Sequence, residues 1–139
     1  MNRIVIGVGN PARGDDGAGV VAAQRSGSNG LVATAPFQLM ELWEGEDDVV
    51  VVDAARSGAS PGTILRFEAG SETLPTGVLG GSTHALGVAE VVELARAMGR
   101  LPPRLMVYGI EIGDLSQGSV LSPEVDAAVD SVVAEVGHA

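Results

Sequence analysis

Residues 48–54 read Asp-Val-Val-Val-Val-Asp-Ala, four consecutive valines with an aspartate at each end. A run of β-branched residues without polar alternation is typical of a strand that is buried on both faces of a parallel sheet. We therefore expect this strand to lie centrally in a sheet. Its second aspartate, Asp53, is then expected at the carboxyl end of that strand.

Hydrophobic patterns and turn residues predict the other elements on either side of this strand. Further strands are expected at residues 3–8, 31–35, 63–67 and 105–110, and helices at 17–25, 37–43, 84–98 and 122–136. The strand at 63–67 is expected at an edge of the sheet, where an antiparallel direction is allowed. This order predicts an α/β fold, an open doubly wound, mostly parallel sheet of about five strands with helices on both faces. Residues 1–139 are expected to form a single domain.

The composition excludes several kinds of chemistry. The chain has 139 residues and a net charge of −10, it has no cysteine, all eight basic residues are arginine, and its only histidines are His84 and His138. Thiol catalysis, Cys-ligated metals, Schiff bases and a P-loop lysine are thereby excluded. The acidic balance disfavours nucleic acid, and no apolar run approaches the roughly 18 residues of a membrane span. We therefore expect a cytoplasmic protein with no nucleic-acid or membrane partner.

Three side chains are candidates for one site. Asp16 follows the first strand, Asp53 ends the valine strand, and His84 is expected to begin a helix with Ser82 or Thr83 as its cap. In open α/β sheets, ligands bind beyond the carboxyl ends of the strands. Two carboxylates and one imidazole form a partial ligand set for a divalent ion, and a helix N-terminus would keep the imidazole neutral. Taken singly, each side chain could instead have a structural role: a helix cap for Asp16, bonds to loop amides for Asp53, and a satisfied polar group for His84.

Two other kinds of site are disfavoured by the residues themselves. The stretch Gly7-Val-Gly-Asn-Pro-Ala12 resembles a dinucleotide-binding loop, but its proline lacks an N–H and two aspartates follow where phosphates would lie. A serine triad of Ser82, His84 and Asp53 lacks the Gly-x-Ser-x-Gly turn that exposes such a nucleophile. The metal hypothesis is therefore favoured over both.

The chain resembles the hydrogenase maturation proteases, which process the large subunit of [NiFe]-hydrogenases. The resemblance covers nearly the whole chain and rests on the segments 7–19 (GVGNPARGDDGAG), 51–54 (VVDA), 57–63 (SGASPGT), 82–87 (STHALG), 108–111 (YGIE) and 121–124 (LSPE). One departure lies after the second strand, where Ala33-Thr-Ala-Pro-Phe37 stands in place of the glycine-rich turn of many relatives.

This resemblance implies an endopeptidase with an open α/β fold. Its expected partner is the large subunit precursor, from which it removes a C-terminal extension after nickel insertion. The implied ligands are Asp16, Asp53 and His84, around a Ni²⁺ ion that the substrate carries and that other divalent metals could replace. Two further hypotheses remain: a nickel-binding chaperone that holds the large subunit without cutting it, and a nucleotide-binding module. The sequence leaves the oligomeric state open and allows a monomer.

Overall fold

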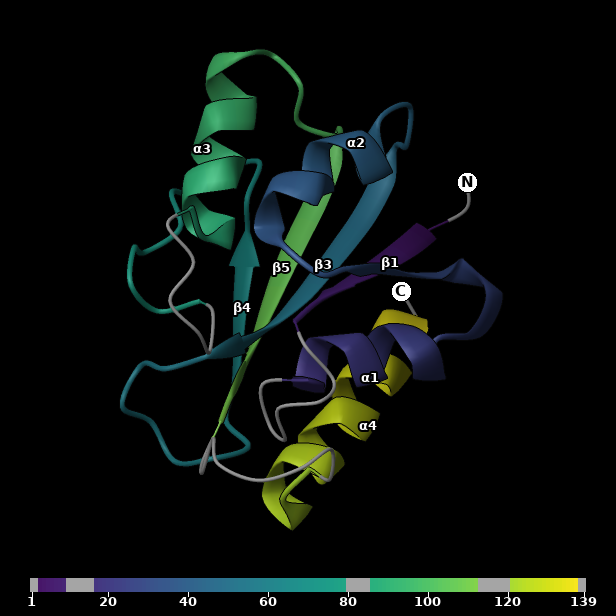
Figure 1. Cartoon of the computed structure of the whole chain (residues 1–139), viewed down its shortest axis with the longest axis vertical. Coiled ribbons are helices and arrows are strands. Elements are labelled where there is room, and N and C mark those ends of the chain that lie inside the picture. Colours follow the sequence, from purple (N-terminus) through teal and green to yellow (C-terminus); the bar gives the residue numbers. More distant parts are fainter. Residues whose placement is uncertain (1–2, 10–16, 80–85, 113–120, 138–139) are drawn as a thin grey trace.

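The computed structural model describes residues 3–9, 17–79, 86–112 and 121–137. These residues form one five-stranded sheet with helices on both sides (Figure 1). The elements are β1 (Arg3–Val8), α1 (Ala18–Arg25), η2 (Gly27–Asn29), β2 (Gly30–Ala33), η3 (Pro36–Gln38), α2 (Leu39–Trp43), β3 (Asp48–Ala55), β4 (Ile64–Glu68), α3 (Val88–Ala97), β5 (Arg104–Glu111) and α4 (Pro123–Gly137). No helix in the described ranges is both long and apolar enough to cross a membrane.

The sheet has the order β2-β1-β3-β5-β4, so the valine strand β3 is at its centre. β3 runs parallel to β1 on one side and to β5 on the other, with Val50 paired to Val5 and to Met106. β4 is the antiparallel edge strand next to β5. The predictions of a doubly wound α/β fold, a central valine strand and an edge strand near residues 63–67 are therefore confirmed.

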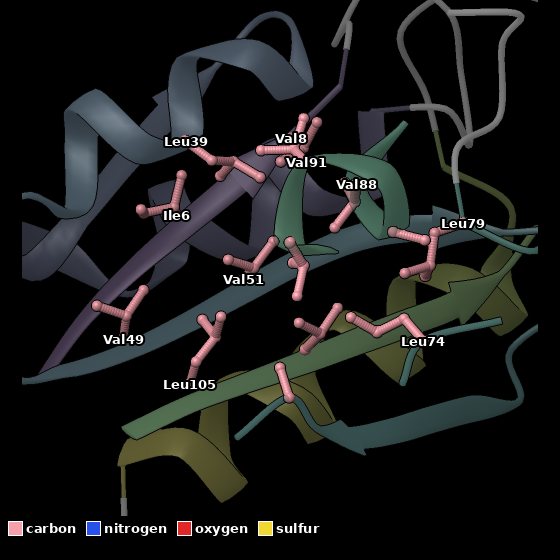
Figure 2. Close-up of a cluster of buried hydrophobic side chains, with 14 of the residues drawn as sticks. Ile6, Val8, Leu39, Val49, Val51, Leu74, Leu79, Val88, Val91 and Leu105 are labelled. Carbon is pink, nitrogen blue, oxygen red and sulfur yellow. The ribbon is translucent and has the colours of Figure 1, made fainter. Parts of the chain in front are cut away.

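The two faces of β3 contribute to two separate cores. Val49 and Val51 belong to the cluster on the face covered by α2 and α3 (Figure 2). Val50 and Val52 belong to the cluster on the opposite face, under α1 and α4. All four valines are at most 2% exposed, and burying such a side chain contributes about 1.5–3 kcal/mol. Burial on both faces holds β3 firmly and fixes the position of its carboxyl end.

The expected start of the helix at residue 84 is wrong. α3 begins at Val88, because Gly87 has the extended conformation φ −88°, ψ 179° that precedes a helix. The N-cap residue is Gly87, in place of Ser82 or Thr83, and its N–H donates a hydrogen bond to Oε1 of Glu90 at 2.9 Å. Apolar periodicity located the helix but not its first residue, since that residue depends on a backbone angle and one side-chain bond.

Candidate active site at the carboxyl edge of the sheet

Asp53 is a buried carboxylate near the end of the central strand. It is 3% exposed, and its Oδ1 accepts a hydrogen bond from the Ala54 N–H at 2.8 Å. Val51 and Ala55, which share its side of the strand, belong to the core under α2 and α3, so Asp53 points to this face because side chains alternate along a strand. Burying a carboxylate is unfavourable for stability. Because ligands of open α/β sheets bind beyond the carboxyl ends of the strands, its position makes Asp53 a candidate site residue.

Helix α1 begins directly on the carboxyl ends of β1 and β3. A Cβ at Gly19 would lie 2.2 Å from the carbonyl oxygen of Val52 and 2.6 Å from that of Val8, and a Cβ at Gly7 would lie 2.0 Å from the carbonyl oxygen of Gly19. Only glycines allow this approach of the helix backbone to the two strands. The described residues that follow Asp16 in the chain are thus fixed next to Val52, the neighbour of Asp53 in β3.

The described residues on either side of segment 80–85 also lie at this edge of the sheet. Leu79 forms an antiparallel bridge with Ala55, and Figure 2 shows its side chain in the core on the α3 side of the sheet. That side chain occupies the space above Gly109, where a Cβ would lie 2.9 Å from its Cδ2. A Cβ at Gly87 would lie 3.9 Å from the carbonyl oxygen of Leu79. The two described ends of the segment that contains His84 therefore lie close together near the end of β3.

Glu111 is a second buried carboxylate and does not belong to the predicted trio. It is 4% exposed, ends β5 and pairs in register with Ala55. Its side-chain oxygens accept hydrogen bonds from Ser57, from the N–H at 2.9 and 3.1 Å and from the hydroxyl at 2.6 Å. The sequence carries the same signal for Glu111 as for Asp53, because both are acidic residues at the end of an apolar strand.

Of the predicted trio, the structure describes Asp53 alone. Asp16 and His84 lie outside the described residues, and within the described ranges no group of three or more His, Cys, Asp or Glu side chains could hold a metal ion. Because α3 starts four residues after His84 in the chain, His84 is not the first residue of this helix, contrary to the expectation from the sequence. The metal site therefore remains a prediction that rests on the sequence and on the described flanks.

Comparison with known proteins identifies the family. The doubly wound sheet carries two buried carboxylates, Asp53 and Glu111, at the edge where open α/β sheets bind their ligands. The family model for hydrogenase maturation protease matches residues 33–139. The chain belongs to this family, and it is therefore a peptidase.

Individual relatives agree with this assignment. The hydrogenase expression/formation protein HupD of Rhodobacter capsulatus is 27% identical over 142 residues, an alignment that covers 95% of this chain and 68% of that protein. The [NiFe] hydrogenase maturation protease HybD from Thermococcus kodakarensis superposes with a TM-score of 0.77 at 27% identity, covering 99% of this chain and 98% of its own. The hydrogenase maturating endopeptidase HybD from Escherichia coli gives 0.75 at 25% identity, with 98% and 90% covered.

Proposed function

We propose that this chain is a cytoplasmic endopeptidase that removes the C-terminal extension of a [NiFe]-hydrogenase large subunit precursor after nickel insertion. Residues 1–139 act as one domain in this proposal. Asp16, Asp53 and His84 bind the nickel ion that the precursor carries, so that the enzyme distinguishes loaded from empty precursor.

One observation carries the assignment of these residues. The chain on one side of each of two segments contacts the carboxyl end of β3. Gly19 packs against the carbonyl oxygen of Val52, and Leu79 forms an antiparallel bridge with Ala55. Asp53 lies between these two points on the same strand. The two segments whose flanks meet there, 10–16 and 80–85, are the ones that contain the other two proposed ligands.

The chemistry of the three side chains supports a substrate-borne metal. Carboxylate and imidazole are ligands that divalent first-row metals accept, and three protein ligands leave further coordination positions for atoms of the substrate. A bound divalent ion can polarise a carbonyl group or orient the attacking water. We assign to Asp16 the additional role of general base for the water that attacks the peptide bond.

The test is the mass of the precursor after incubation with the enzyme. Wild type should shorten nickel-loaded precursor and leave nickel-free precursor intact. Asp53→Asn, Asp16→Ala and His84→Ala should each slow processing by about a hundredfold or more, as expected for the loss of a catalytic acid or base.

Two matched variants control for loss of charge and of histidine. Asp48→Asn removes an aspartate from the other end of the same strand, where Asp48 pairs with Arg3 at 3.2 Å, and His138→Ala removes the second histidine. Both should process the precursor at the wild-type rate. If all three site variants also do so, the site assignment is wrong. A wild-type protein that binds the loaded precursor and yields no shortened product would refute the protease proposal in favour of a non-cleaving chaperone.

A further inference from the structure

We propose that Glu111 is a positioning residue of this peptidase, which holds residues 56–63 as a substrate-contacting loop at the carboxyl edge of the sheet, next to Asp53. The inference rests on the proposed function above and adds a residue and a loop to it. Residues 56–63 connect β3 to β4 and begin three positions after Asp53 in the chain.

The carboxylate of Glu111 holds the start of the loop. Its two oxygens accept three hydrogen bonds from Ser57, two from the N–H and one from the hydroxyl. The preceding residue is held as well, because the Arg56 N–H donates to the Val78 carbonyl at 2.7 Å. The first two residues of the loop are therefore fixed to β5 and to the chain that leads into segment 80–85.

The backbone of Glu111 holds the end of the same loop. Its carbonyl accepts a hydrogen bond from the Gly62 N–H at 2.9 Å, and its N–H donates to the Thr63 carbonyl at 2.8 Å. Gly62 has a φ of +91°, and a Cβ there would lie 2.8 Å from the Glu124 carbonyl oxygen at the start of α4. One residue thus fixes both ends of the loop.

The part of the loop between these anchors is open to solvent. Ser57, Gly58, Ser60 and Pro61 are all exposed, although the backbone at both ends of this stretch is hydrogen bonded. Enzymes with an α/β fold bind their ligands on exposed loops at the carboxyl edge of the sheet. The loop is therefore suited to contact the part of the precursor chain that passes Asp53.

Stability alone does not account for a carboxylate at position 111. Burying a charged or polar group is costly, and an apolar residue of similar volume is often as stable or more so. Among the described residues, the hydrogen bonds to this carboxylate all come from Ser57. The buried carboxylate therefore serves mainly to define the conformation of an exposed loop.

The test separates substrate binding from chemistry. Glu111→Ala frees Ser57 and should raise the KM for nickel-loaded precursor about tenfold, with kcat changed by less than about threefold, because hydrogen bonds to a charged group are worth about one order of magnitude in affinity. Glu111→Gln keeps one acceptor oxygen and should recover part of the loss. Ser57→Ala keeps the N–H donor and should raise KM by a smaller factor than Glu111→Ala.

Glu135→Gln is the matched control. Glu135 accepts hydrogen bonds from Arg66 and Tyr108 and belongs to α4, on the opposite face of the sheet, so this variant should keep the wild-type KM. A wild-type KM in Glu111→Ala, or an equal rise in Glu135→Gln, would overturn the proposal.

The test also separates misfolding of the variant, and inactivity of the wild type, from failure of the proposal. If Glu111→Ala does not fold, Ser57→Ala decides the question, since Ser57 is exposed and its substitution should not prevent folding. A wild-type KM in Ser57→Ala would refute the proposed role of the bond between Ser57 and Glu111. Failure of the wild type to cleave loaded precursor would refute the proposed function itself, and is thereby distinguished from failure of this inference.

Discussion

Substitution of Gly19 by alanine tests whether the start of α1 is packed as closely on the sheet as the structure indicates. The added Cβ would lie 2.2 Å from the carbonyl oxygen of Val52 and 2.6 Å from that of Val8. An ordinary carbon–oxygen contact is about 3.3–3.6 Å, so the helix and the strands must separate by about 1 Å. Neither strand can yield easily, because both belong to the central part of the sheet.

The free-energy change has two opposing contributions. Overpacking a close contact costs about 1–3 kcal/mol, and two backbone atoms at this distance place Gly19→Ala at the upper end of that range. Alanine recovers up to about 1 kcal/mol of helix propensity relative to glycine. We therefore expect a net loss of about 2 kcal/mol in the free energy of unfolding, or about 6–10 °C in Tm for a chain of this size.

Urea unfolding followed by circular dichroism measures this loss. The matched control is Gly70→Ala, because a Cβ at Gly70 would meet no heavy atom within 4 Å and Gly70 lacks a positive φ, so its stability should change by less than about 0.5 kcal/mol. Under conditions where Gly19→Ala is folded, precursor processing should still be slowed, since the residues next to Asp16 are displaced. A Gly19→Ala protein as stable as wild type would refute the close packing of α1.

Two other regions give predictions that can be tested by unfolding experiments. Hydrogen bonds from Arg66 and then from Tyr108 lower the pKa of Glu135 from 4.5 to about 2, so the stabilisation is present above about pH 4.5 and is lost as the pH falls through about 2. Wild type should accordingly lose more stability over this pH range than Glu135→Gln, and identical losses would contradict the assigned bonds. Trp43 is 2% exposed and its Nε1–H donates to the Arg100 carbonyl at 2.9 Å. Trp43→Phe should therefore cost about 1–3 kcal/mol in urea unfolding followed by circular dichroism, and an unchanged midpoint would contradict this bond.

The features that could be predicted from the sequence are those that depend on local residue patterns. Four valines identified β3 and its central place, because continuous burial requires cover on both faces, and the same strand identified Asp53. The helix start at Val88 was missed because it is set by the extended backbone of Gly87. Glu111 ends an apolar strand as Asp53 does, but its hydrogen bonds to Ser57, 54 positions away in the chain, could not be predicted from the sequence. Such long-range pairs leave no periodic signal.

The carboxyl edge of this sheet is organised by close contacts that glycines permit. Gly19 lets α1 begin on the carbonyl oxygens of Val8 and Val52, while Gly109, in register with Asp53, leaves room for Leu79. Both contacts involve positions adjacent to Asp53 along β3 or opposite it on β5. A larger side chain at either glycine would therefore alter the surroundings of the buried carboxylate without removing any polar group. Replacement of Gly19 or Gly109 by alanine should therefore slow precursor processing, measured by the mass of the precursor, although no polar group is lost.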